Sequence, residues 1–335
     1  MKKNITVSLL LSLFLLVSCG KSKTSANGCY KDINSAKIAA QKNNQDILVV
    51  VTMAGDDVSS QDFVTNVLNT ESFAKDIASK YAAVHMDFSQ ASYEKTVVNP
   101  EADKKTQKAA EEYALLMQEN AKFASLMNVQ NTPALFLFTK EVYVITELDY
   151  TEDVKSSNDL VALIQSEQTA IDNVHAMVEA VNNSSKLEKV TAIDRLYEAT
   201  ELLYQPFLKD LIAEVLSIDK KNESGVLSKY IMAKADSDAA YLDVLGDAEG
   251  ASDIYVKICD NEYLLPEYKQ QAYYLAAYLL SMSGSTDFDK ILGCLEKSLE
   301  ADPQSEQVPN IQNVINYFKE AFSNMQNTDS LTGEL

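Results

Sequence analysis

Patterns typical of β-strands are confined to one part of this chain, and this confinement limits the folds that it can adopt. Residues 47–51 form a continuous apolar run rich in valine, which is typical of a strand buried on both faces. Residues 82–88 alternate between the two faces of a strand, and residues 134–138 and 142–145 predict a hairpin. From residue 158 onward, apolar side chains recur only at helical spacing. The sequence therefore predicts an α/β unit followed by an all-helical unit.

Helical segments are expected before and between these strands. One begins with the capping residues that follow Asp32, and a second covers residues 59–80 with a polar break at Asn69 and Thr70. A third covers residues 101–127. The predicted order is therefore helix, strand, helix, strand, helix, strand, strand.

This order, with Thr132 and Pro133 directly before a strand of the hairpin, resembles the thioredoxin fold and in particular the thioredoxin-like proteins that bacteria export. The resemblance covers residues 32–168. It implies that the Thr132–Pro133 bond is cis and that the backbone before it is free to pair with an extended peptide. Thr132 and Pro133 are therefore the candidate peptide-binding ledge, while a rigid entry to the strand is the alternative role of this proline.

The two cysteines on which thioredoxin chemistry depends are absent from this chain. Counting back from the helix break that follows Val67 places their positions at Asp57 and Ser60. Disulfide exchange needs one thiolate to attack and a second thiol to resolve the mixed disulfide, and these side chains supply neither. Asp57 is suited instead to cap the helix that follows it. We therefore expect a degenerate active-site loop at Asp57 and Ser60 and no catalytic residue.

The second half of the chain predicts short antiparallel helices with a weak internal repeat. Residues 254–266 recur 37 residues later, where Pro266 is matched by Pro303, and residues 275–303 resemble a tetratricopeptide unit. The repeat of that family is about 34 residues, and Leu279 stands where the family usually has glycine. Stacked helical hairpins leave a concave face that commonly binds peptides or proteins. An irregular helical bundle that only stabilises the chain is the alternative.

The N-terminal segment predicts export and lipid anchoring. Lys2 and Lys3 precede an apolar run, residues 5–17, that is too short to span a bilayer. Leu16-Val17-Ser18-Cys19 resembles the lipobox of bacterial lipoproteins, which implies that Cys19 carries fatty acids such as palmitate and becomes the mature N-terminus. Gly20 stands where an aspartate would mark retention in the inner membrane, so outer-membrane placement is preferred.

Five segments are therefore predicted along the chain. They are a signal peptide at 1–18, a flexible tether at 19–31, a thioredoxin-like domain at 32–168, an α-helical tetratricopeptide-like domain at 169–325 and a disordered tail at 326–335.

Composition excludes several classes of partner and cofactor. The formal net charge of −20 leaves no basic face for a phosphate backbone, so nucleic acid is not an expected partner. The two histidines, His85 and His175, lie far apart in sequence with no cysteine at metal-ligand spacing, so no metal is expected. No nucleotide-binding glycine motif occurs, and no cofactor is predicted.

Three cysteines follow Cys19. Cys29 is expected to be a free thiol because no second cysteine lies near it in sequence. Cys259 and Cys294 lie on two predicted helices, and an exported protein could join them in a disulfide or keep both as unpaired core thiols.

Together these features predict a non-catalytic, lipid-anchored protein that binds a protein or peptide partner in the bacterial cell envelope. The alternative is a thiol-disulfide redox enzyme that uses Cys29, Cys259 or Cys294 from outside the usual motif. This alternative requires one of those thiols to lie near residues 55–60.

Overall fold

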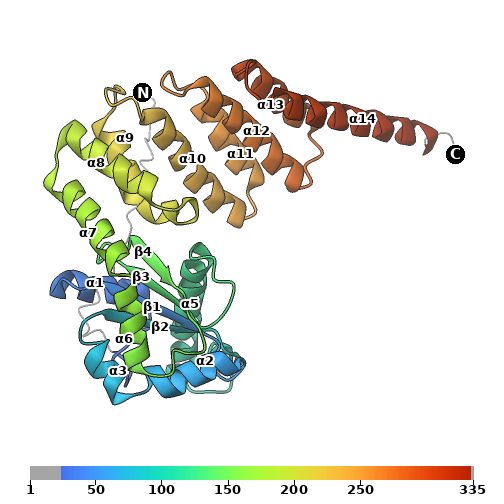
Figure 1. Cartoon of the computed structure of the whole chain (residues 1–335). Coiled ribbons are helices and arrows are strands. Elements are labelled where there is room, and N and C mark those ends of the chain that lie inside the picture. Colours follow the sequence, from blue (N-terminus) through green and yellow to red (C-terminus); the bar gives the residue numbers. More distant parts are fainter. Residues whose placement is uncertain (1–23, 333–335) are drawn as a thin grey trace, which may run out of the picture.

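The structure, a computed structural model, describes residues 24–332 (Figure 1). A sheet flanked by helices comes first in the chain, and a region built only of helices follows it. The predicted signal peptide at 1–18 and the lipidation site Cys19 lie outside the described residues. The described part therefore has the mixed α/β unit and the all-helical unit that the sequence predicts.

Four strands form one mixed sheet in the order β2-β1-β3-β4. β1 pairs in parallel with β2 and antiparallel with β3, and β3 forms an antiparallel hairpin with β4. The strands are β1 (Ile47–Thr52), β2 (Ala82–Asp87), β3 (Ala134–Phe138) and β4 (Val144–Leu148).

The central strand β1 is buried along its whole length because helices cover both faces of the sheet. Val49 and Val51 face a core completed by α1 and α5, whereas Leu48 and Val50 face a core completed by α2, α3 and α6. The helices of this part are α1 (Ile33–Asn43), α2 (Val58–Phe63), α3 (Glu71–Asp76), α4 (Gln90–Glu94), α5 (Lys104–Leu126) and α6 (Ser157–Ser166).

The helix predicted over residues 59–80 is divided at its polar break. A π-helical turn, η1 (Val64–Leu68), continues α2, and Thr70 then caps α3 by accepting a hydrogen bond from the backbone of Phe73 at 3.1 Å. The Thr70 hydroxyl also donates to the carbonyl oxygen of Val67 at 2.7 Å. These local hydrogen bonds compete with the helical ladder, which explains the break.

The prediction of a flexible tether at 19–31 is wrong for residues 24–31, the part of it that the structure describes. Cys29 is completely buried in the core beneath α2 and α3. The backbone of Tyr30 donates to the carbonyl oxygen of Ala83 at 2.7 Å and forms a bridge to β2. The chain is ordered here because Cys29 fills core space and Tyr30 satisfies backbone groups at the edge of the sheet.

All described residues after β4 are in helices or their connections. From α10 onward each helix packs against the next, and their shared core includes Cys259, Ala276 and Leu295 (Figure 1). The helices are α7 (Gln168–Asn183), α8 (Lys186–Ala199), η2 (Leu202–Leu208), α9 (Lys209–Ile218), α10 (Leu227–Val244), α11 (Ala248–Ile258), α12 (Pro266–Met282), α13 (Phe288–Ala301) and α14 (Val308–Thr332).

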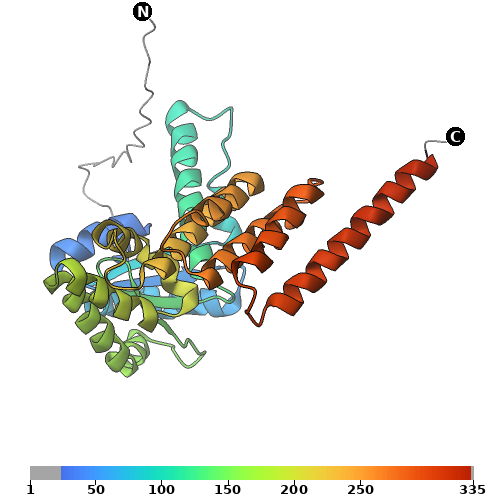
Figure 2. The same ribbon diagram turned by 90° about the horizontal axis from the view of Figure 1, so that it is seen from above.

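Of the disordered tail predicted at 326–335, residues 326–332 are instead helical, because α14 continues to Thr332 and extends away from the other helices, and residues 333–335 lie outside the described residues (Figure 2). No glycine or proline interrupts residues 310–332, so nothing in the sequence ends the helix earlier.

The helical region contacts the sheet through the short 3₁₀ helix η2. The ring of Tyr204 packs edge-on against Phe136, and the ring of Phe207 packs against Phe123 and Phe138. The hydroxyl of Tyr143 donates to Asp210 on α9 at 3.0 Å. The sheet and the helical region therefore share a core.

The packing also crosses the boundary predicted between residues 168 and 169, which falls at the start of α7. Ile171 of α7 lies in the core beneath α2 and α3. His175, one turn further along α7, lies with its Nε2 atom 2.9 Å from Asp46 beside β1. α7 therefore belongs to both parts of the structure.

Replacing Phe138 with alanine is expected to lower the free energy of unfolding by about 3–5 kcal/mol, because its buried ring packs against Phe123, Phe136 and Phe207. Val244→Ala is the control, since this side chain is 84% exposed and its loss should cost less than about 0.5 kcal/mol. Urea unfolding followed by circular dichroism measures both. Equal losses in the two variants would contradict this packing.

Candidate functional site

Three segments meet where β1 and β2 end at their carboxyl termini. The loop at residues 53–57 follows β1, the turn at residues 88–92 follows β2, and the segment at residues 128–133 leads into β3. Val51, at the end of β1, pairs with Ala134 at the start of β3, which holds the first and third segments side by side.

The structure brings together the site residues that the sequence predicted. One carboxylate oxygen of Asp57 accepts hydrogen bonds from the backbone N–H of Ser60 at 2.9 Å and from the hydroxyl of Thr132 at 3.3 Å. The buried hydroxyl oxygen of Ser60 accepts from the backbone N–H of Met53 at 3.1 Å. The Thr132–Pro133 bond is cis. Asp57 and Ser60 therefore connect the loop to the segment before β3.

Asp57 is the N-cap of α2, as the sequence predicted. Hydrogen bonds from Ser60 hold the pKa of Asp57 below its ordinary value, although its slight burial acts in the opposite direction. The charged carboxylate is thus stabilised by the start of the helix, which is the expected effect of an acidic N-cap. Its hydrogen bonds support a structural role in the loop.

Asp87 holds the same loop from the side of β2, and sequence reasoning missed this role. Its carboxylate accepts hydrogen bonds from the hydroxyls of Ser89 and Ser92, both at 2.7 Å, and from the backbone N–H of Ala54 at 3.0 Å. Thr52 also donates to Asp87 at 3.3 Å, directly across the parallel pairing of β1 and β2. The two serines that follow Asp87 closely in sequence were the available signal of such a turn.

Burial and hydrogen bonding act oppositely on Asp87. Burial alone would raise the pKa of Asp87, but the hydrogen bonds from Ser89, Ser92 and Ala54 outweigh it and lower the pKa. Neighbouring His85 lies with Nε2 2.8 Å from the hydroxyl of Thr52, and burial lowers the pKa of His85. At neutral pH this cluster therefore contains a charged Asp87 beside a neutral His85.

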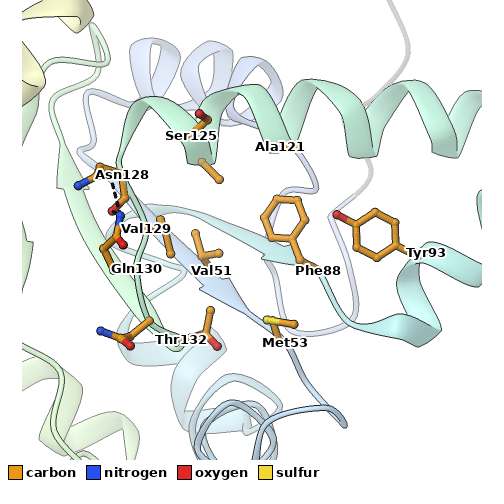
Figure 3. A pocket seen from close by; sticks show the side chains of 12 residues that line it. Val51, Met53, Phe88, Tyr93, Ala121, Ser125, Asn128, Val129, Gln130 and Thr132 are labelled. Atoms are coloured by element: carbon orange, nitrogen blue, oxygen red, sulfur yellow. Dashed lines mark hydrogen bonds between the residues drawn. The ribbon is translucent and has the colours of Figure 1, made fainter.

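Two hollows flank the segment at residues 128–132. The first, of about 470 Å³, is lined mainly by apolar and aromatic residues, including Val51 of β1, Phe88 after β2 and Tyr93 of α4 (Figure 3). The second, of about 500 Å³, lies between this segment, the end of β4 and η2. Asn128, Gln130 and Asn131 line both hollows.

The backbone of this segment has free hydrogen-bonding capacity. Asn128 ends α5 with a φ of 53°, a left-handed conformation that asparagine tolerates well and that turns the chain out of the helix. Among the described residues, none accepts a hydrogen bond from the backbone N–H groups of Gln130, Asn131 or Thr132. Gln130 and Asn131 line both hollows and Thr132 lines the first, so a chain bound here could accept from these donors.

The three cysteines of the described residues are buried free thiols and line neither hollow. Burial raises the pKa of Cys29 to about 12 and that of Cys259 to about 11, and it also raises the pKa of Cys294. The pairing of Cys259 with Cys294, which the sequence left open, is not formed in the structure, although both lie in the same core.

Across residues 24–332, no group of three or more histidine, cysteine or acidic side chains is placed to hold a metal ion. His85 and His175 contact different partners, Thr52 and Asp46. Within the same residues, no helix has both the length and the apolar character needed to cross a membrane.

Asp87→Asn is expected to lower the free energy of unfolding at neutral pH by about 1–3 kcal/mol, because the charged acceptor of several hydrogen bonds is lost. The folded-state pKa of Asp87 is depressed, so this stabilisation is complete above the unfolded-state value of about 3.9 and is lost as the pH falls through the folded-state pKa. The difference between the two proteins should therefore shrink below about pH 4.

Urea unfolding of both proteins from about pH 7 to about pH 3 measures this difference. Asp243→Asn, at an exposed position of α10, is the control and should change stability by less than about 0.5 kcal/mol. A difference for Asp87→Asn that stayed constant over this range would show that the carboxylate charge is not the cause.

Parts of the chain are similar in sequence to known proteins. Residues 226–324 match the family model TP_0391_C, described as "Uncharacterised protein C-terminal domain", which covers α10 to α13 and much of α14. The chain is 26% identical over 162 residues, 48% of its length, to a protein of Treponema pallidum (strain Nichols) described as "Uncharacterized protein". The match covers 54% of that relative, so the chain spans about half the length of the curated relative that it matches.

Part of the structure is similar to a solved protein named "DsbH Oxidoreductase". The similarity has a TM-score of 0.30 at 12% sequence identity and covers 43% of this chain and 90% of that chain.

Proposed function

We propose that this protein is a lipid-anchored component of the bacterial cell envelope that binds an extended segment of a partner protein without exchanging disulfides. The observation that carries the proposal is that the backbone N–H groups of Gln130, Asn131 and Thr132 have no acceptor among residues 24–332, while Gln130 and Asn131 line both hollows. The binding surface belongs to a degenerate thioredoxin-like domain, and the order β2-β1-β3-β4 with Pro133 directly before β3 supports that assignment.

Binding follows from the chemistry of an exposed backbone. An extended peptide offers carbonyl oxygens at regular spacing, and it can add to a free backbone edge as an extra strand. Its successive side chains point to opposite faces, so neighbouring side chains can enter different hollows. The backbone then supplies affinity for any sequence, and the two hollows select among sequences.

Disulfide exchange is not supported by the thiols of the described residues. Attack requires an accessible thiolate. Cys29, Cys259 and Cys294 are buried, and burial raises the pKa of each of them, so they remain protonated at neutral pH. The positions next to the segment are Asp57 and Ser60, whose side chains cannot form a mixed disulfide.

The helical region completes the proposed protein as a tetratricopeptide-like stack. The sequential packing of α10 to α14 and the recurrence of residues 254–266 after 37 residues support this assignment. The net charge of −20 supports a body held away from an anionic membrane, so that the lipid on Cys19 provides the attachment.

Cys19→Ser is expected to abolish labelling of the protein with a palmitate analogue and to move the protein from the membrane fraction to the soluble fraction. Cys29→Ser is the matched control and should retain both label and membrane attachment, because Cys29 is buried in the core. Label on the Cys19→Ser protein would contradict the proposed anchor.

Binding can be tested with fluorescent peptides that alternate valine with lysine, glutamine or glutamate. We expect peptides of this panel to bind and to slow hydrogen exchange at one or more of the N–H groups of Gln130, Asn131 and Thr132, because the donors that face the peptide become hydrogen-bonded. Ser125→Trp, which fills the first hollow from an exposed position of α5, should weaken binding at least about tenfold.

Leu115→Trp is the control for this variant, because Leu115 is 64% exposed on α5 and lines neither hollow. It should bind as tightly as the unmodified protein. Failure of the whole panel to bind, or binding that leaves exchange at these three N–H groups unchanged, would overturn the proposed function.

A further inference from the structure

The second hollow differs from the first in charge. Glu147 and Asp149 line it, no lysine or arginine of residues 24–332 does, and most of its other lining residues are apolar or aromatic. The first hollow has no charged lining residue. The two sides of the binding segment therefore offer different chemistry to a bound chain.

Nearby carboxylates raise the pKa of two tyrosines that line the second hollow, Tyr150 and Tyr204. Burial raises the pKa of Tyr150, and the charges of Glu152, Asp57 and Asp62 raise it further. Burial, the charge of Glu147 and its hydrogen bond raise the pKa of Tyr204 to about 12. Glu147 thus lies beside one wall of the hollow, at Tyr204, whereas the ring of Tyr150 packs against Phe63 of α2, the helix that Asp57 caps and that contains Asp62.

The helical region supplies one wall of this hollow. Leu203 and Tyr204 of η2 line it, and the Tyr204 hydroxyl donates to Glu147 at 3.2 Å. Leu203 remains 43% exposed, and its neighbour Leu202 is 82% exposed. An apolar surface on η2 is thus held beside the carboxylates of β4 by contacts between the two parts of the chain.

We propose that the partner segment bound along residues 130–132 inserts a lysine or arginine side chain into the second hollow and an apolar side chain into the first. This inference rests on the proposed function and names the chemistry of its partner. The aliphatic part of the basic side chain lies against Leu203, and its charged end reaches Glu147 and Asp149.

The balance of charges favours this occupant. A cation in the hollow meets the acidic residues Glu147 and Asp149, which attract it through charge. An acidic side chain would instead meet like charge without a basic neighbour, which is costly. The net charge of −20 also accelerates the approach of a basic partner.

The test compares the valine–lysine, valine–glutamine and valine–glutamate peptides by fluorescence anisotropy on the full protein. The lysine peptide should bind about tenfold more tightly than the glutamine peptide at low salt, and the glutamate peptide should bind most weakly. This preference should decrease when the salt concentration is raised to about 0.5 M.

The double variant Glu147→Gln and Asp149→Asn should remove most of the preference for lysine while it retains binding of the glutamine peptide. The amide that Glu147→Gln introduces keeps an oxygen for the Tyr204 hydroxyl, so η2 should stay in place. The control is Glu111→Gln with Glu262→Gln, which removes the same charge from exposed positions away from both hollows. Leu203→Ala should weaken binding of the lysine peptide without changing the unfolding midpoint of the protein.

The outcomes distinguish failure of this inference from failure of the proposed function. If the three peptides bind equally, or if the double variant keeps the full preference for lysine, the inference is wrong while the binding function stands. If no peptide binds and the protein sediments as a dimer, a second copy of the chain occupies the two hollows and both proposals fail. A preference that the double variant loses and the control pair keeps supports the inference.

Discussion

The burial of β1 on both faces is the constraint on which the rest of the structure depends. Alternate side chains of this one strand enter two separate cores, so every neighbouring helix is positioned against it. β1 also pairs with β2 on one side and with β3 on the other. The three segments of the candidate site leave the sheet at the ends of these strands, and their separation follows from strand pairing. The site is therefore positioned by strands of the fully buried centre of the sheet.

Much of this arrangement could be predicted from the sequence because its signals are local. The valine-rich run of β1, the hairpin after Pro133 and the cap at Asp57 all depend on residues close together in the chain. The serines after Asp87 indicate a turn, but the contact of Asp87 with the loop after β1 could not be predicted in the same way, because it needs the parallel pairing that places Thr52 opposite Asp87. The docking of η2 was hidden for the same reason, since the rings of Tyr204 and Phe207 do not reveal which surface they cover.

The loop after β1 is held in shape by hydrogen bonds of polar side chains. Asp57 and Ser60 use their polar atoms to join the loop to Thr132 and Met53, so the loop has a defined shape without sulfur. Asp87 adds a second support from β2. The neighbouring N–H groups of residues 130–132 are not used by these contacts. Structural hydrogen bonds and free donors thus coexist within a few residues of each other.

The docking of Cys29 and Tyr30 has a consequence for how the protein would sit on a membrane. Only five peptide units separate Cys19 from residue 24, and an extended chain of that length reaches no more than about 18 Å. The chain is then held at the β2 edge of the sheet, whereas the acidic hollow lies at the opposite edge beside β4. If Cys19 carries lipid, as proposed, this short connection would orient the β2 edge toward the bilayer and the acidic hollow toward the aqueous space.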